Sequence, residues 1–298
     1  MSAVQNIAFE HLVTKAQLDK TLDFWLDEDL PTLDVAGALV GRDHQTARLI
    51  CKQQCILAGK LFFDAIMTRF DCNVEWTESV RDGVRVGEVP KVLATVRGSV
   101  QSLLLAERTA LNVLSRCSGI ATVTHQVVEK LESVKWRGRL AATRKTTPGF
   151  RLAEKYAVIV GGGDPHRYSL KTMIMLKDNH VDAMRDDIQK QAVSVTRQLC
   201  GNYQMIEVEA RSLNEALAAA HAGANVVMLD NFQPEDAKTA GAAVKHKNPS
   251  IVVEVSGGIT EANILQYCHE HVDSISMSKL TQGYDTIDFS MKLNKQSA

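Results

Sequence analysis

The pattern of hydrophobic and polar positions changes along this chain at about residue 138. Before that point the pattern is mixed. Residues 15–30 have helical spacing, and residues 73–100 form short alternating segments in which Asp82-Gly83 marks a tight turn. Residues 101–130 return to helical spacing. We therefore expect helices and strands to be mixed in the amino-terminal part.

The helical stretch places an arginine on its predicted apolar face. Leu104, Arg108, Leu111 and Ser115 fall at positions i, i+4, i+7 and i+11. A charged group on an apolar stripe is costly unless it is paired. Arg108 is therefore expected to have an anionic partner.

After residue 138, apolar strands alternate with polar tips, turns and helical segments. Seven strand candidates lie at residues 139–143, 157–161, 172–177, 204–210, 225–231, 251–258 and 273–278. A helical segment separates most of them, and this order predicts a parallel sheet and, with seven strands, an α/β barrel or near-barrel. Helix boundaries are signalled by a capping box at Ser212–Glu215, by Pro234 in a first turn, and by Gly223 at a helix end.

Two domains follow from this reading. We expect a mixed α/β domain over residues 1–115 and an α/β barrel over residues 116–282, with the strand-like closing segment 283–298 returning to the first domain. The fold class is therefore α/β, a mixed amino-terminal domain plus an incomplete barrel of about seven strands.

Strand parity divides each barrel strand into an apolar face and a face with polar residues. Side chains two positions apart share a face, so Ile206 and Val208 oppose Glu207 and Glu209. The same division applies to the strands that contain Lys177, Asp230, Glu254, Ser256 and Ser276. If the apolar faces meet the surrounding helices, the polar faces surround the barrel axis near its carboxyl end, where barrel enzymes place their chemistry. A structural network of ion pairs inside the barrel is the alternative.

The acidic strand ends indicate a metal and phosphate site. Glu209 and Asp230 end strands that we expect to be neighbours, about 4.8 Å apart if paired, and hard oxygen ligands of this kind suit Mg²⁺. Ser256, Gly257 and Gly258 end the next strand and precede an expected helix start, whose backbone N–H groups can hold a phosphate. A plain glycine turn is the alternative.

Cations are expected at other strand ends of the same barrel. Arg144 and Lys145 follow the first strand, His166 and Arg167 follow Gly161–Gly163, and Lys177 ends another strand. Arginine matches a carboxylate through two parallel hydrogen bonds. These cations are more than one phosphate requires, so we expect the ligands of the site to carry at least one further anionic group. His125, His246, His269 and His271 receive no role.

Composition narrows the class of protein. The chain has 298 residues, 45% of them hydrophobic, and 34 Lys+Arg against 35 Asp+Glu for a net charge of -1. This balance argues against disorder and against a nucleic-acid-binding domain. No apolar run approaches the roughly 20 residues of a membrane span. Six cysteines without a CxxC pair, and no signal peptide, favour a cytoplasmic protein with reduced thiols.

The motifs around these residues resemble the quinolinate phosphoribosyltransferase family of NAD biosynthesis. The likeness runs from "LLLAERTALNVLSRCSGIAT" through "TRKTTPGFRLAEKYAV", "HRYSL", "KDNH", "EVE", "LDNF" and "SGGIT" to "ISMSKLTQ". It implies an enzyme that transfers phosphoribose from phosphoribosyl pyrophosphate to quinolinate with decarboxylation. Nicotinate mononucleotide, pyrophosphate and CO₂ would be its products.

The resemblance also implies roles for residues. The pyridine dicarboxylate would be surrounded by Arg108, Arg144, His166, Arg167 and Lys177. Lys145, Glu209 and Asp230 would act on phosphoribosyl pyrophosphate and its Mg²⁺. The 5′-phosphate would contact Ser256, Gly257 and Gly258, with Ser278 and Gln282 nearby. Arg108 would reach the partner's site in a homodimer, with Lys145, Lys177, Glu209 and Asp230 as catalytic residues.

Three segments depart from the family pattern. Residues 27–37 replace a usual "EDxGxGDxT" motif, Asp164-Pro165 stands where a small residue or asparagine is usual, and Ser278 and Gln282 stand where glycine and often histidine occur. Three other functions remain open. They are a Schiff-base enzyme that uses Lys177, a non-catalytic module that binds phosphorylated metabolites, and a related phosphoribosyltransferase that acts on another heterocycle.

Overall fold

The computed structural model describes residues 8–30, 32–184 and 191–294. The chain forms two compact units: the first comprises residues 1–125, 146–162 and 283–298, and the second comprises residues 126–145 and 163–282. The predicted boundary after residue 115 lies inside helix α4 (Val100–Ser133), and residues 116–125 and 146–162 belong to the first unit. Residues 1–7, 31 and 295–298, which fall in predicted segments, lie outside the described residues.

The first unit is built on an antiparallel sheet. Its strand order is β12-β1-β5-β3, so the last strand of the chain pairs with the first. The strands are β1 (His44–Cys51), β3 (Asn73–Trp76), β5 (Lys91–Ser99) and β12 (Phe289–Leu293). A separate pair comprises β2 (Cys55–Ile56) and β4 (Arg85–Val86). The predicted turn at Asp82-Gly83 precedes β4, and Gly83 has a φ of 86°.

Helices complete the first unit. They are η2 (Phe9–Leu12), α1 (Lys15–Asp29), α2 (Val35–Val40), α3 (Lys60–Arg69) and α5 (Arg151–Val160), together with most of α4. Trp25, Phe62 and Tyr156 from these helices and Phe150, which precedes α5, form an aromatic cluster in which neighbouring ring centroids are 5.3–5.6 Å apart. This cluster is part of the core of the first unit.

The apolar stripe of α4 differs from the prediction. Its buried positions include Leu103, Ala106, Ala110 and Leu114, each with no exposed surface. Leu104 is 42% exposed, and Arg108 is exposed as well. The prediction placed residues of two neighbouring helix faces on one face. Steps of four and three residues fit the buried stripe equally well when they start one residue earlier, at Leu103. Arg108 therefore lies on a face that this unit leaves open.

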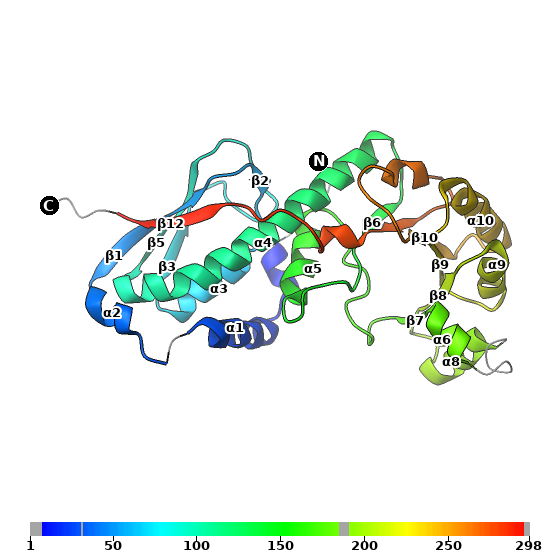
Figure 1. Cartoon of the computed structure of the whole chain (residues 1–298), viewed down its shortest axis with the longest axis horizontal. Helices are drawn as coiled ribbons and strands as arrows, with labels where there is room; N and C mark the ends of the chain where they lie inside the picture. The colour runs from blue at the N-terminus through cyan, green and yellow to red at the C-terminus, as the bar shows by residue number, and fades with distance from the viewer. Residues whose placement is uncertain (1–7, 31, 185–190, 295–298) are drawn as a thin grey trace. The chain divides into compact units, whose positions relative to one another are not determined.

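The second unit contains a parallel sheet of six strands (Figure 1). Its order is β6-β11-β10-β9-β8-β7, and each of these pairs is parallel. The strands are β6 (Arg139–Ala141), β7 (Ile174–Leu176), β8 (Ile206–Ala210), β9 (Val226–Asp230), β10 (Val252–Ser256) and β11 (Ser274–Ser276). The predicted α/β fold with an incomplete barrel is confirmed, with six strands in place of seven.

The strand predicted at residues 157–161 is wrong, because these residues complete and end helix α5 in the first unit. Val158, Ile159 and Val160 favour a strand by propensity. A run of five apolar residues cannot separate a buried strand from a buried helix turn by its period. Ala153, Tyr156 and Ala157 are buried along with Val158 and Val160, so α5 is buried around most of its circumference.

Helices cover the second sheet where the sequence signals them. They are α6 (Asp178–Ala183), α8 (Ala192–Cys200), α9 (Leu213–His221) and α10 (Pro234–Lys247), followed by the short η3 (Ile264–Tyr267) and η4 (Ser278–Leu280). Ser212 caps α9 by accepting a hydrogen bond from the Glu215 N–H at 3.2 Å. Pro234 opens α10, and Gly223 follows the end of α9 with a φ of 88°. Among the described residues, no helix combines the length and the apolar composition needed to cross a bilayer.

Candidate active site

A cavity of about 550 Å³ opens at the carboxyl end of the parallel sheet, and all of its lining residues belong to the second unit. We call it the polar cavity. It brings together ten of the predicted site residues, namely Arg144, Lys145, His166, Arg167, Lys177, Glu209, Asp230, Ser256, Gly257 and Gly258. Residues from six separate parts of the sequence therefore meet in one place.

Strand parity explains which side chains reach the polar cavity. Glu209 of β8, Met228 and Asp230 of β9, and Glu254 and Ser256 of β10 all line it. The alternate residues of these strands, including Val227, Leu229, Val253 and Val255, are fully buried. The predicted division into a polar inner face and an apolar outer face is therefore confirmed for these strands.

Glu209 and Asp230 end neighbouring strands, as predicted. β8 pairs with β9, although Glu209 lies opposite Met228, two residues before Asp230. Glu209 forms an ion pair with Lys177 and accepts a hydrogen bond from the Asp178 N–H at 3.2 Å. Burial, and then the charge of Glu209, raises the pKa of the Asp230 carboxyl. Two carboxylates that repel each other beside a polar cavity fit a hard divalent cation such as Mg²⁺.

Arg167 is a buried cation that faces the polar cavity. Only 7% of the residue is exposed, and its terminal nitrogens donate to the Met173 carbonyl at 3.4 Å and the Met175 sulfur at 3.5 Å. Its Nε has no hydrogen-bond partner among the described residues. Burial, and then the charge of Arg144, lowers the pKa of Arg167. A buried guanidinium with such weak hydrogen bonds is suited to an incoming anion.

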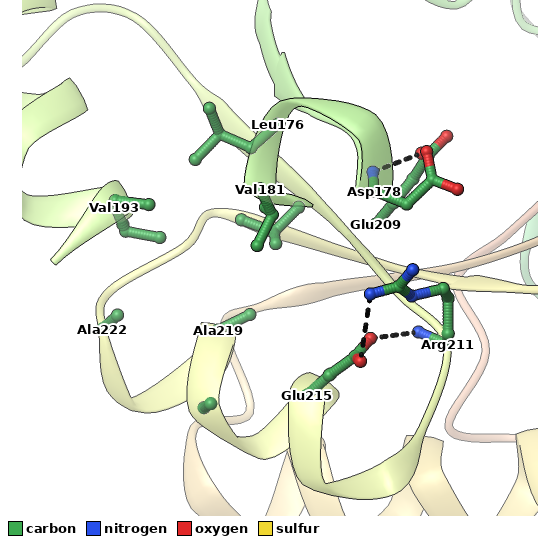
Figure 2. A pocket seen from close by; sticks show the side chains of 12 residues that line it. Leu176, Asp178, Val181, Val193, Glu209, Arg211, Glu215, Ala219 and Ala222 are labelled. Carbon is green, nitrogen blue, oxygen red and sulfur yellow. Dashed lines mark hydrogen bonds and ion pairs between the residues drawn. The ribbon is translucent and has the colours of Figure 1, made fainter. Parts of the chain in front are cut away.

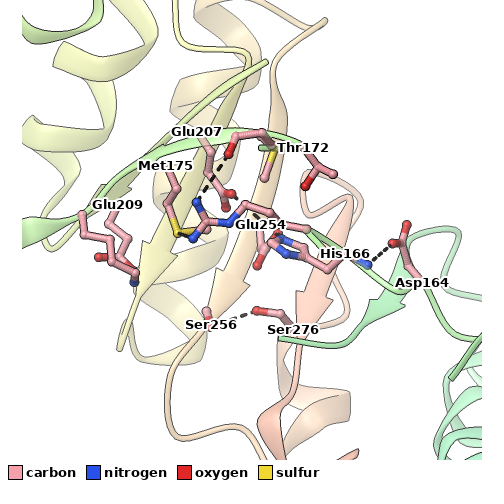
Figure 3. A network of polar contacts seen from close by, with 12 residues as sticks. Asp164, His166, Thr172, Met175, Glu207, Glu209, Glu254, Ser256 and Ser276 are labelled. Atoms are coloured by element: carbon pink, nitrogen blue, oxygen red, sulfur yellow. Dashed lines mark hydrogen bonds and ion pairs between the residues drawn. The ribbon is translucent and has the colours of Figure 1, made fainter. Parts of the chain in front are cut away.

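His166 lies beside two buried acids (Figure 3). Its Nε2 is 2.9 Å from Oε2 of Glu254 and 4.0 Å from Oε2 of Glu207. Glu207 has no exposed surface, and neither of its carboxyl oxygens has a hydrogen-bond partner among the described residues. Burial, and then the charge of Glu254, raises the pKa of Glu207 to about 8. Parity placed both acids on the inner face, but nothing in the sequence assigned either of them to His166.

The backbone at His166 is also unusual. His166 has a φ of 54°, in the left-handed region that non-glycine residues rarely adopt. Its N–H donates to Oδ1 of Asp164 at 2.6 Å. Asp164, which departs from the resembled pattern, therefore helps to hold this conformation.

The glycine pair at the end of β10 makes a tight turn. Gly257 and Gly258 have φ values of 88° and 64°, and a Cβ on Gly257 would lie 2.3 Å from Oδ1 of Asn231. Glycine is therefore required at position 257. The predicted helix start is wrong, because turns follow Gly258 and the next helical segment is η3. Backbone N–H groups of a loop can still bind a phosphate, without the dipole of a helix.

Three predicted site residues do not line the polar cavity. Arg108 belongs to the first unit and is exposed on α4. Ser278 begins η4, and its carbonyl accepts the N–H groups of Thr281 and Gln282 at 3.1 and 3.0 Å. The Thr281 hydroxyl donates to the Lys145 carbonyl at 2.8 Å, so this turn lies next to the cavity residue Lys145. The sequence missed this arrangement because η4 is only three residues long.

A second cavity, of about 220 Å³, lies against the same strands (Figure 2). We call it the apolar cavity, because eight of its twelve lining residues are apolar, among them Leu176, Val193 and Val208. Asp178, Glu209, Arg211 and Glu215 lie at one end, where the Asp178 N–H donates to Glu209. Its walls offer few partners for a doubly charged ligand, so the polar cavity is the candidate active site.

Comparisons with known proteins agree over almost the whole chain. The family model described as quinolinate phosphoribosyl transferase, N-terminal domain, matches residues 34–118, and that of the C-terminal domain matches residues 120–292. The chain is 46% identical to nicotinate-nucleotide pyrophosphorylase (carboxylating) of Rattus norvegicus, over 95% of this chain and 93% of that protein.

Solved structures give the same result. NadC from Streptococcus pyogenes is similar with a TM-score of 0.86 and 36% identity, over 95% of this chain and 98% of that one. The nicotinate-nucleotide pyrophosphorylase from Francisella tularensis has a TM-score of 0.83 and 31% identity, over 99% and 100% of the two chains.

Proposed function

This chain belongs to the quinolinate phosphoribosyl transferase family, and we infer that it transfers phosphoribose from phosphoribosyl pyrophosphate to quinolinate, with decarboxylation. The products are nicotinate mononucleotide, pyrophosphate and CO₂. The observation that carries this conclusion is the match of both domain models, which together span residues 34–292 apart from one residue. The polar cavity agrees with it, because cations and carboxylates lie in the same cavity.

The reaction needs two bond exchanges. The quinolinate nitrogen attacks C1′ of the sugar, and the bond from C1′ to the pyrophosphate oxygen breaks with its electron pair leaving on pyrophosphate. The ring nitrogen becomes cationic, so it can stabilise the electron pair left at C2 when the 2-carboxylate departs as CO₂. A proton then replaces CO₂ at C2. The contribution of the protein is mainly placement and charge stabilisation.

The cations are proposed to hold the pyridine through its two carboxylates. Arg144, Arg167, His166 and Lys177 line the polar cavity. Arg167 is supported best, because it is buried and no carboxylate among the described residues lies at hydrogen-bond distance from it. A pyridine with one carboxylate would leave part of this charge unmatched. Since a charge-assisted hydrogen bond is worth about 1.5–3 kcal/mol, nicotinate should bind about tenfold to a hundredfold more weakly than quinolinate.

The acids are proposed to serve phosphoribosyl pyrophosphate. Glu209 and Asp230 would hold Mg²⁺, which offsets the charge that develops on the departing pyrophosphate. Lys145 is placed by the hydrogen bond from Thr281 to its carbonyl, and it would contact the phosphates. The loop of Ser256, Gly257 and Gly258 would bind the 5′-phosphate, with Ser278 and Gln282 on the adjacent turn.

A direct assay tests this function. Enzyme, quinolinate, phosphoribosyl pyrophosphate and Mg²⁺ are mixed, and nicotinate mononucleotide and CO₂ are followed together. We expect equal amounts of both products. Efficient turnover of nicotinate with none of quinolinate would refute the assignment and favour another heterocycle as substrate.

A Schiff-base reaction at Lys177 is less well supported. Such an amine must lose its proton in an apolar setting, whereas Lys177 forms an ion pair with Glu209. Borohydride in the presence of carbonyl substrates would trap a covalent adduct in that case. Under the proposed function no adduct forms.

We also propose a homodimer in which Arg108 of one chain completes the site of the other. Its support is the exposed face of α4, which carries Arg108 and Leu104. Arg108→Ala and Glu209→Ala should each be inactive, and an equal mixture should recover about a quarter of wild-type activity, because half of the dimers are mixed and each has one intact site. No recovery after confirmed subunit exchange would contradict shared sites.

The cellular compartment is a proposal as well. Every described cysteine is free of a disulfide, and the sulfurs of Cys51 and Cys55 share a hydrogen bond at 3.8 Å. This usage fits a reducing compartment such as the cytoplasm. Fractionation of cells that express the protein would test the location.

A further inference from the structure

Asn231 follows Asp230 directly and lines the polar cavity, but none of the steps proposed above uses it. It has a φ of 59°, in the left-handed region that residues other than glycine rarely adopt. Asparagine enters this region more readily than most, because its short amide can form local hydrogen bonds. Such a conformation persists only where surrounding contacts determine it, and it is common beside functional sites. The contacts of Asn231 therefore indicate its role.

Two contacts hold Asn231 from the side of β10. Its backbone N–H donates to the Ser256 carbonyl at 2.9 Å, so the ends of β9 and β10 are joined directly after Asp230. Its side chain lies against the backbone of the glycine turn, because a Cβ on Gly257 would be 2.3 Å from Oδ1 of Asn231. The loop proposed to bind the 5′-phosphate therefore fixes the place of this amide.

The amide of Asn231 in turn reaches the carboxylate of Asp230. Nδ2 of Asn231 donates to Oδ2 of Asp230 at 2.8 Å. Since an ionised carboxylate only accepts hydrogen bonds, the amide nitrogen and not the amide oxygen must face it. Among the described residues, no other group donates a hydrogen bond to this carboxylate. Oδ1 of Asp230 is therefore the oxygen left for a ligand.

The other acid proposed to hold Mg²⁺ is fixed in a different way. Glu209 forms an ion pair with Lys177 and accepts the Asp178 N–H, so two groups orient its carboxylate. Asp230 is only partly buried, and the Asn231 amide is the group that orients it. Outer hydrogen bonds of this kind set the direction of a metal-binding carboxylate, and their loss typically weakens metal binding or activity about tenfold to a hundredfold.

We propose that Asn231 is a positioning residue for phosphoribosyl pyrophosphate, whose amide holds the Asp230 carboxylate and leaves Oδ1 for the Mg²⁺ that accompanies this substrate. Because Asn231 is itself held by the Ser256–Gly258 loop, it links the two parts of the site that take the pyrophosphate and the 5′-phosphate. The inference rests on the proposed function and extends it to a residue outside the predicted site. Binding of phosphoribosyl pyrophosphate depends on Asn231, whereas binding of quinolinate does not.

Two variants remove the hydrogen-bond donor and keep a backbone that tolerates positive φ. Asn231→Gly has no side chain, whereas Asn231→Asp keeps the shape but has no hydrogen to donate when it is ionised. Each KM is measured with the other substrate saturating. In both variants the KM for phosphoribosyl pyrophosphate should rise about tenfold to a hundredfold, with the KM for quinolinate changed less than about twofold. Equal rises for both substrates, or a wild-type KM for phosphoribosyl pyrophosphate in Asn231→Gly, would overturn the proposal.

A matched control separates the hydrogen bond from relief of backbone strain. Lys135 also has a left-handed φ, of 56°, but it is exposed and does not line the polar cavity. Lys135→Gly relaxes the backbone in the same way and should leave both KM values unchanged. The melting temperature of Asn231→Gly should stay close to that of the wild type, because glycine relieves strain while it adds freedom to the unfolded chain. An equal rise in the KM for phosphoribosyl pyrophosphate in Lys135→Gly would contradict the role of the amide.

Two measurements that need no turnover complete the test. Calorimetric titration with phosphoribosyl pyrophosphate and Mg²⁺, without quinolinate, should give a Kd about tenfold to a hundredfold higher in Asn231→Gly than in the wild type. Crystal structures should show the Asp230 carboxylate in one orientation in the wild type and rotated or in several orientations in the variant. An equal Kd or an unchanged carboxylate would overturn the proposal. Failure of the wild type to use quinolinate would refute the proposed function, whereas this titration tests Asn231 whichever heterocycle is the acceptor.

Discussion

The polar cavity and the apolar cavity share two of their strands, β7 and β8. Leu176 and Val208 line the apolar cavity, and Lys177 and Glu209, each one residue further along, line the polar cavity. Glu209 reaches both, at the point where its carboxylate accepts the Asp178 N–H. The difference shows how a period of two residues separates packing from chemistry along one strand. It also implies that substitutions on the polar face should lower activity, whereas substitutions on the apolar face should lower stability.

The largest effect is expected at Asp230, on the polar face of β9. Asp230→Asn removes a charge proposed to hold Mg²⁺, and kcat/KM for quinolinate should fall about a hundredfold to a thousandfold. The melting temperature should stay the same or rise slightly, because burial opposes the ionised form of this carboxyl and raises its pKa. Asp236→Asn, in the first turn of α10, is the control and should keep full activity. A small loss of kcat/KM in Asp230→Asn together with a large loss in Asp236→Asn would contradict the proposed role of Asp230 in holding Mg²⁺.

The adjacent residue should show the opposite behaviour. Leu229 is fully buried on the outer face of β9, and Leu229→Ala should lower the free energy of unfolding by about 3 kcal/mol. Chemical denaturation measures this loss. The kcat per folded molecule, measured well below the melting temperature, should stay close to that of the wild type. A proportionate loss of kcat would mean that the two faces are not independent.

Sequence reasoning succeeded where the chemistry follows strand parity. Glu209, Asp230 and Ser256 line the polar cavity as predicted. They could be predicted because their strands are short and regular, with clear apolar residues at the alternate positions. Loop residues such as Arg144 and His166 were named as candidate cations from the sequence, but only the resemblance gathered them around one ligand, since nothing in a loop's local pattern states where it will fold back.

The wrong predictions concern segments in which the hydrophobic pattern has no clear period. Residues 157–160 lie in a helix because the aromatic cluster of the first unit buries α5, which a short apolar run cannot reveal. The glycine pair after β10 forms a turn with positive φ rather than a helix start. A sequence of the same residues can open either structure, so the pattern could not separate them. The pairing of Glu254 with His166 joins positions 88 residues apart, so only the folded sheet shows it.

Arg167 tests how specific the polar cavity is for acid groups. Arg167→Lys keeps the charge but loses the planar fork that can bind a carboxylate through two hydrogen bonds. The KM for quinolinate should rise about tenfold, with a smaller change in kcat. Arg211→Lys is the control, because Arg211 lies at the apolar cavity and pairs with Asp182 at 3.0 Å. Steady-state kinetics that showed equal effects at both arginines would indicate general loss of charge rather than recognition.

Glu207 is the exception to the division between the faces, since it lies on the polar face and yet should affect stability. Its pKa is raised to about 8 in the folded protein, from an ordinary value of 4.5. Between these values the folded chain keeps a proton that the unfolded chain releases. Stability from this group is therefore complete below about pH 4.5 and is lost progressively as the pH rises toward 8.

Glu207→Gln removes this pH dependence, because glutamine does not ionise. Without Mg²⁺ or substrates, the variant should be more stable than the wild type by an amount on the order of 3 kcal/mol at pH 7, and the difference should vanish near pH 4. Denaturation at a series of pH values measures it, with the exposed Glu235→Gln as a flat reference. A variant less stable than the wild type at pH 7 would show that Glu207 is ionised and paired in the folded protein. The inner face would then be a network of ion pairs, and the polar cavity would be a poorer fit for a doubly charged substrate.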